Sequence, residues 1–120
     1  MCRRVLIVDD NSAFRAAARQ LLTRAGFVVV AEAGDGAEGL RAAKEHTPEL
    51  VIVDVQLPDF DGFEVAERLG AVEPAPQVIL TSSLDGTDFG ALVAGSSALG
   101  FIPKAELSPR AIEALLAPTR

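Results

Sequence analysis

The stretch LVIVD at residues 50–54 places four aliphatic residues directly before an aspartate, and the similar stretch VLIVDD occupies residues 5–10. Short runs rich in Val and Ile predict strands that are buried on both faces of a parallel sheet. An ionised carboxylate at the end of such a strand is costly unless a cation neutralises it. Ligands of open α/β sheets bind at the carboxyl ends of the strands. We therefore expect Asp9, Asp10 and Asp54 to meet there around a hard cation.

Helix-like and strand-like segments alternate along the rest of the chain. Asp35 and Glu38, for example, form a capping-box pattern that opens a helix ending near His46. The alternation predicts an α/β fold with five strands and five helices, arranged as one parallel sheet with right-handed crossovers and helices on both faces. The expected strands are 5–8, 27–31, 50–54, 78–82 and 99–102, and the expected helices are 14–25, 35–46, 63–69, 88–94 and the segment after Ser108-Pro109.

Length and charge restrict the class of protein. A chain of 120 residues is long enough for one domain with one core, so we expect a single domain over residues 1–120 with no output domain. The net charge of −6 comes without a basic stripe, which argues against direct nucleic-acid binding. No apolar run approaches the roughly 20 residues of a membrane span. The single cysteine, Cys2, fits a reducing compartment, and we expect a cytoplasmic protein.

Two further polar groups stand at predicted strand ends. Lys104 follows the last strand, where its ammonium can pair with a carboxylate or a phosphate. Thr81 and Ser82 end the strand 78–82, and either hydroxyl can satisfy local backbone groups or bind an anion beside Asp54. Mg²⁺ suits the acidic cluster because it prefers oxygen ligands and retains several waters. These groups predict a site at one edge of the sheet that holds both a cation and an anion.

This arrangement closely resembles the receiver domain of bacterial two-component response regulators. The resemblance rests on four motifs in order: VDD at residues 8–10, DVQLP at 54–58 with Asp61-Gly62, LTSS at 80–83, and ALGFIPK at 98–104. It covers essentially the whole chain. It implies a flavodoxin-like (βα)5 fold whose strands lie in the order 2-1-3-4-5.

The resemblance implies a role for each acidic residue. Asp54 would be the phosphoacceptor, taking a phosphoryl group from a histidine kinase, a phosphotransfer protein or a small phosphodonor. Asp10 and Asp54 would bind Mg²⁺ through their side chains, with Asp9 acting nearby through water. Gln56 stands where the family supplies a main-chain carbonyl to the metal. The chain would then be no enzyme beyond catalysing its own phosphorylation and slow dephosphorylation.

The resemblance also implies a switch that reads the phosphoryl group. Lys104 would pair with the phosphoryl oxygens, and Ser82 would move to bond one of them, with Thr81 as the competing choice. Phe101 stands at the aromatic position expected to swing inward with the hydroxyl. Leu84 is apolar and cannot orient a water, so we expect a long-lived phosphoryl group.

The output surface would comprise the helix at 88–94, the strand at 99–102 and the last helix. We expect it to act on a partner, on a C-terminal DNA-binding output domain absent from this chain, or on a second copy in a homodimer. The sequence leaves open whether this chain acts alone or belongs to a longer regulator.

Three other functions are open to an α/β chain of this kind. A phosphatase of the haloacid dehalogenase type needs a second Asp two residues after the nucleophile, where this chain has Gln56. A flavodoxin-like FMN binder needs a phosphate-cradling loop after the first strand, where Asp9 and Asp10 would repel phosphate. A phosphorylation-independent interaction module with the receiver fold remains the alternative, and the intact set of site residues argues against it.

Overall fold

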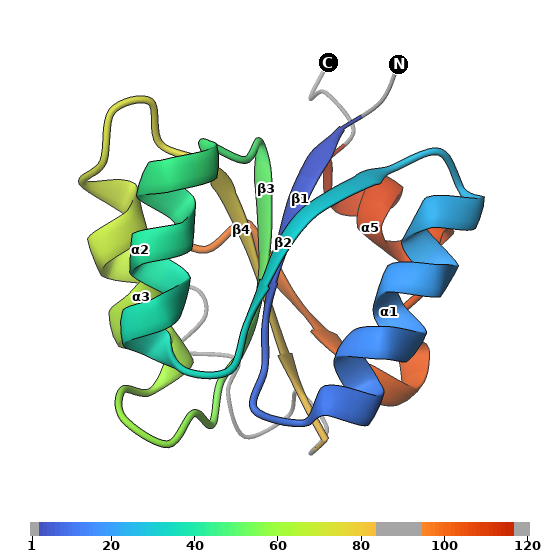
Figure 1. The fold of residues 1–120 in the computed structure, drawn as a ribbon, viewed down its shortest axis with the longest axis horizontal. Helices are drawn as coiled ribbons and strands as arrows, with labels where there is room; N and C mark the ends of the chain where they lie inside the picture. Colours follow the sequence, from blue (N-terminus) through green and yellow to red (C-terminus); the bar gives the residue numbers. More distant parts are fainter. Residues whose placement is uncertain (1–2, 84–94, 117–120) are drawn as a thin grey trace.

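The computed structural model describes residues 3–83 and 95–116. Its five parallel strands form one sheet in the order β2-β1-β3-β4-β5, which confirms the expected strand order. Figure 1 shows α1 and α5 on one side of this sheet and α2 and α3 on the other. The elements are β1 (Arg4–Val8), α1 (Ser12–Arg24), β2 (Val28–Ala33), α2 (Gly36–His46), β3 (Leu50–Asp54), α3 (Gly62–Gly70), β4 (Gln77–Ser82), β5 (Gly100–Pro103), the 3₁₀ helix η2 (Lys104–Glu106) and α5 (Pro109–Leu116).

Several elements differ from the predicted bounds by one or two residues at an end, and β2 is the case with a clear physical reason. Strand β2 extends to Ala33, two residues beyond the prediction, although it includes the charged residue Glu32. Arg15 and Arg19 pair with that carboxylate, which removes the cost of placing it in a strand. Strand β5 begins at Gly100 and ends at Pro103, one residue later than predicted at each end. The predicted helix at 88–94 and the position of Leu84 lie outside the described residues.

The two faces of the sheet have separate hydrophobic cores. Successive side chains of a strand point to opposite faces, so alternate residues join different cores. Ile7 of β1, Ile52 of β3 and Ile79 of β4 pack on the face covered by α1 and α5, whereas their neighbours pack on the α2 and α3 face. Two residues further along the same strands are Asp9, Asp54 and Thr81. The alternation therefore directs both buried carboxylates to the α1 side of the carboxyl edge.

Side-chain caps define where the helices begin. The Asn11, Asp35 and Asp61 side chains accept hydrogen bonds from the backbone three residues on, at 2.8–3.0 Å. Glu38 of the predicted capping box reaches back to the Gly34 N–H at 2.8 Å. Ser108 Oγ accepts from the Ala111 N–H at 3.0 Å, which confirms the predicted start of the last helix. None of the helices within the described ranges is long and apolar enough to cross a membrane.

Candidate functional site

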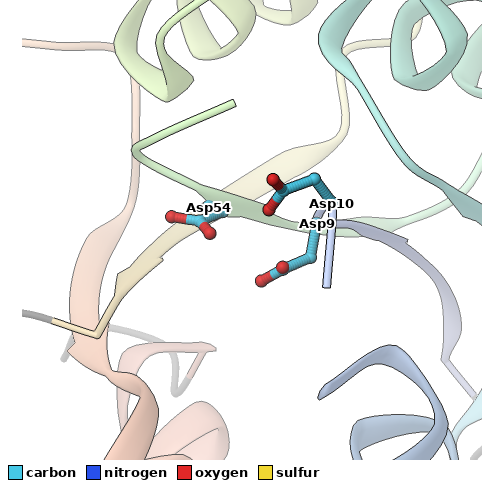
Figure 2. Close-up of side chains that lie close together, drawn as sticks. All are labelled: Asp9, Asp10 and Asp54. Carbon is cyan, nitrogen blue, oxygen red and sulfur yellow. The ribbon is translucent and has the colours of Figure 1, made fainter. Parts of the chain in front are cut away.

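Three carboxylates converge at the carboxyl edge of the sheet. Asp9 and Asp10 follow β1 directly, and Asp54 is the last residue of its neighbour β3, whose Val53 pairs with Val8. Figure 2 shows the three side chains directed into the same space. One oxygen from each lies within 4.8 Å of the others. Asp9 and Asp54 are buried, whereas Asp10 is exposed.

Lys104 supplies the positive charge that this cluster requires. It follows β5 at the start of η2, and its Nζ lies 2.7 Å from Asp9 Oδ2 and 3.1 Å from Asp54 Oδ2. Burial lowers the pKa of Lys104, but both carboxylates together outweigh it, so the net pKa is raised. Burial raises the pKa of Asp54, as does the Asp9 charge, against the opposing effects of the Gln56 N–H and Lys104. Lys104 therefore stays charged between two buried acids.

Each buried carboxylate has one oxygen bound locally and one directed at the ammonium. Asp9 Oδ1 accepts the Asn11 N–H at 2.9 Å, and Asp54 Oδ1 accepts the Gln56 N–H at the same distance. Both are turns in which an Asp side chain bonds the backbone two residues on. Apart from its ion pair, the buried Asp9 Oδ2 receives no directed hydrogen bond. Both acids consequently keep an oxygen available for a ligand of the site.

The oxygen ligands of the site and the distances between them fit Mg²⁺. Two ligands on opposite sides of Mg²⁺ lie roughly 4 Å apart, since metal–oxygen distances are about 2.1 Å. The three carboxylate oxygens are spread over a similar distance. The buried Asp9 Oδ2 without a directed hydrogen bond is the kind of atom that a cation would satisfy.

Thr81 and Ser82 are both fully buried at the end of β4. Thr81 pairs in register with Asp54, and its hydroxyl contacts the Val53 carbonyl of β3 at 3.5 Å. Ser82 is the last residue of the strand and pairs in register with Pro103, directly before Lys104. The contact gives the Thr81 hydroxyl a structural use, and the role of Ser82 as the switch hydroxyl stays a prediction.

The other two predicted site residues are Gln56, two residues after Asp54, and Phe101 of β5. Gln56 is exposed, donates its N–H to Asp54 and forms an isolated bridge with Asp61. Phe101 of β5 is partly buried and packs against the core on the α2 and α3 face. Their roles as carbonyl donor and as aromatic switch stay predictions.

The structure adds residues that the sequence patterns did not identify as part of the site. Phe14 of α1 lies with its ring centroid 4.5 Å from Lys104 Nζ, a cation–π contact. Arg15, the next residue, donates a hydrogen bond to the backbone carbonyl of Asp9. Both were predicted only as residues of the helix expected at 14–25. Helical periodicity cannot show that the first turn of α1 lies over the site.

The loop after β3 is held against α2 by Asp59, which the sequence analysis also missed. Its two carboxylate oxygens accept the N–H groups of Gly36 and Ala37 at 2.7 and 2.9 Å. The Ala37 bond, with those from Gly36 and Phe60, outweighs desolvation and lowers the pKa of Asp59. Because Asp59 and Gly36 are 23 residues apart, no local pattern relates them.

Comparison with known proteins gives the same family by two routes. The family model described as response regulator receiver domain matches residues 5–116. A putative transcriptional regulator of Pseudomonas aeruginosa is 39% identical over 103 residues, which cover 86% of this chain and 50% of that protein. The chemotaxis protein CheY of Bacillus subtilis is 32% identical over 115 residues, covering 96% of each chain.

Solved structures agree with the sequence matches. A two-component response regulator of the LuxR family from Aurantimonas sp. SI85-9A1 superimposes with a TM-score of 0.88 at 33% identity, covering all of this chain and 89% of that one. The chain spans about half the length of the Pseudomonas aeruginosa regulator and of the Bordetella pertussis regulator BvgA, which is 36% identical. The chain belongs to the response regulator receiver domain family of two-component signalling.

Proposed function

We propose that this receiver domain is a phosphorylation-activated switch in which Asp54 accepts a phosphoryl group from a histidine kinase or a phosphotransfer protein. The observation that carries the proposal is the position of the Asp54 carboxylate. It is buried at a strand end, with Oδ2 3.1 Å from Lys104 Nζ and with the Asp9 and Asp10 carboxylates beside it. A histidine kinase draws on ATP, so we place the reaction in the cytoplasm.

The residues of this chain divide the work of the transfer. An Asp54 oxygen attacks phosphorus, the new O–P bond forms as the P–N bond to the kinase histidine breaks, and the imidazole leaves with the electron pair. Asp9, Asp10, Asp54 and the Gln56 carbonyl would hold Mg²⁺, which when bound neutralises charge on the transferring group. Lys104 is already directed at Asp54 and would shift its ion pair to a phosphoryl oxygen. The Gln56 N–H keeps Asp54 Oδ1 oriented throughout.

The phosphorylated site would be read by the neighbouring strands. The acyl phosphate adds roughly −1 to −2 charge beside the buried Ser82 and Lys104. We propose that Ser82 and Phe101 rearrange in response and alter the surface that includes β5 and α5. The Pseudomonas relative is described as a putative transcriptional regulator, and the 103 matched residues are half of its length. We therefore propose a DNA-binding output domain as the controlled partner, with homodimerisation through this surface.

Phosphorylation of the isolated chain with acetyl phosphate and Mg²⁺ tests the proposal. We expect intact mass spectrometry to show an adduct of about 80 Da, the mass of one phosphoryl group. Asp54→Asn should lack the adduct, and the control Asp35→Asn, which removes an acid outside the site, should retain it. An unmodified wild-type chain, or an adduct that persists in Asp54→Asn, would contradict the assignment and leave the phosphorylation-independent interaction module as the better explanation.

A further inference from the structure

We propose that Arg15 is a positioning residue that fixes the Asp9–Asp10 turn in the orientation that binds the cation. Among the described residues, its guanidinium contacts the site through the backbone of Asp9, so its effect would be exerted through the acidic pair. The inference rests on the proposed Mg²⁺ site and assigns a role to a side chain of α1 that the proposed phosphotransfer does not use.

The geometry places one guanidinium at the junction of three elements. From α1, Arg15 donates through an Nη to the Asp9 carbonyl just after β1, and through Nε to Glu32 Oε1 of β2 at 3.1 Å. Its side chain is 20% exposed, and that of Glu32 is 27% exposed. Arg19, one turn further along α1, binds the other Glu32 oxygen at 2.5 Å. Glu32 therefore pairs with both arginines. In the described contacts, Arg15 is the one that also reaches the Asp9–Asp10 turn.

The bond to the Asp9 carbonyl completes the fixation of the Asp9 backbone. The N–H of Asp9 donates to the Ala33 carbonyl of β2 at 2.9 Å. The carbonyl of Asp9 belongs to the peptide that joins it to Asp10, so restraining that carbonyl restrains the direction of both acidic side chains. With Asp9 Oδ1 bound by Asn11, the Oδ2 atom is left directed at the site. Without Arg15, the peptide between the two acids would be restrained by the Asn11 turn but would lose the bond that fixes its carbonyl.

Glu32 determines how the charge of Arg15 affects the site. Arg19 is the largest influence that lowers the pKa of Glu32, and Arg15 adds to it, so Glu32 is ionised at neutral pH. A paired guanidinium repels a nearby cation less than a free one does. Two explanations of the role of Arg15 then predict opposite changes in Mg²⁺ affinity when the side chain is removed. A positioning role predicts weaker Mg²⁺ binding when Arg15 is removed, whereas a purely electrostatic role predicts tighter binding, because a positive charge near the cation is lost.

The test is a titration with Mg²⁺ alone, without any phosphodonor, in wild-type, Arg15→Gln, Arg15→Lys and Arg19→Gln chains. The chain contains no Trp or Tyr, so we would follow the amide resonances of Asn11 and Gln56 by NMR. We expect Arg15→Gln to raise the Kd by about tenfold, the lower end for residues that orient metal ligands. Arg15→Lys keeps the charge but not the planar fork, and we expect it to weaken binding nearly as much. Arg19→Gln also removes a partner of Glu32, and its Kd should stay within about twofold of the wild-type value.

A second readout separates positioning from a general loss of stability. In the absence of metal, Arg15→Gln should shift the Asn11 amide resonance, whose acceptor is Asp9, and leave that of Gln56 in place. The inference is overturned if Arg15→Gln binds Mg²⁺ as tightly as the wild type or more tightly, or if Arg19→Gln weakens binding equally. If Arg15→Gln does not fold, the same comparison is made between Arg15→Lys and Arg19→Gln. An adduct on wild-type Asp54 would leave the proposed function intact in either case.

Discussion

The turn after β1 and the loop after β3 present their buried aspartates in the same way but are held by different means. Asp9 and Asp54 each accept an N–H from two residues on and each direct Oδ2 at Lys104. The β1 turn is held by a side chain, since Arg15 of α1 binds the Asp9 carbonyl. The β3 loop is closed by backbone: the Gly62 N–H donates to the Val55 carbonyl at 2.7 Å, and Gln56 bridges to Asp61.

This difference predicts how each half of the site responds to substitution. A turn held by a guanidinium can lose that contact and still fold, because the remaining backbone is short and bonded to β2. A loop closed by close approach of backbone atoms cannot admit extra atoms without moving the strand end. Substitutions around the turn after β1 should therefore change metal affinity while the chain still folds. Substitutions that add atoms to the loop after β3 should destabilise the fold.

The largest expected effect comes from Gly62→Ala. A Cβ at this position would lie 2.5 Å from the Asp54 carbonyl oxygen and 2.7 Å from Val55 Cα, and neither backbone atom can yield without displacing β3. We expect the free energy of unfolding to fall by about 3 kcal/mol, the upper range for overpacking. Urea denaturation would measure it. Gly34→Ala, in the connection between β2 and α2, is the matched control, because the nearest neighbour of its Cβ would be 3.7 Å away. Equal losses in the two variants would show that the close approach at Gly62 does not cause the loss.

A smaller effect of opposite sign is expected for Asp54→Asn in EDTA. Burial raises the pKa of Asp54, so the folded state favours its proton and the stabilising contribution is lost as pH rises through that pKa. At pH 7 the ionised side chain is thus a cost, and the amide should raise the free energy of unfolding by about 1 kcal/mol, or Tm by about 4 °C. The exposed Asp10, changed to Asn, should give a smaller gain.

Adding Mg²⁺ should reverse the order of stability of the wild-type and Asp54→Asn chains. The cation binds the folded wild-type chain and stabilises it by mass action, whereas Asp54→Asn has lost a proposed ligand. The Tm difference between the two should therefore close or change sign as Mg²⁺ is added, which differential scanning calorimetry would show. A destabilised Asp54→Asn chain in EDTA would mean that the ion pair with Lys104 outweighs the cost of burying the charge.

The smallest effect concerns the link between the β3 loop and α2. Backbone N–H groups, first that of Ala37, lower the pKa of Asp59, so its stabilising contribution is complete above the unfolded-state pKa of about 4 and is lost as pH falls through the lowered value. We expect Asp59→Asn to be less stable than the wild type at pH 7 and the gap to narrow toward pH 3. Urea denaturation at both values measures it, and a constant gap would show that the charge contributes nothing.

Asp35→Asn provides the control for that experiment, because Asp35 caps α2 from its own turn. Asp59 instead joins α2 to the loop that carries Gln56. We therefore expect the Gln56 amide resonance to move in Asp59→Asn and to stay in place in Asp35→Asn. Movement in both would indicate that any weakening of the start of α2 reaches the site.

Much of the fold could be predicted because the relevant signals are local. The runs at 5–8 and 50–54 are too apolar for anything except buried strands, and Asp35 and Ser108 cap the helices that their patterns predict. The end of β2 was missed, because Glu32 looks like a loop residue until two arginines neutralise it. The convergence of Asp9, Asp54 and Lys104 followed from the rule that parallel strands end at one edge.

What the sequence alone determined is the set of chemical groups at the strand ends: three carboxylates, two hydroxyls and a lysine, each placed by its position after an apolar run. Only the tertiary structure decided how those groups are held. The contacts of Arg15 with Asp9 and Glu32, of Asp59 with α2, and of Gly62 with the β3 backbone join residues that the chain order does not relate. The physical reason is that burial and strand alternation are set by the sequence of a single segment. The orientation of a carboxylate depends instead on hydrogen-bond donors and close contacts that other segments of the chain supply.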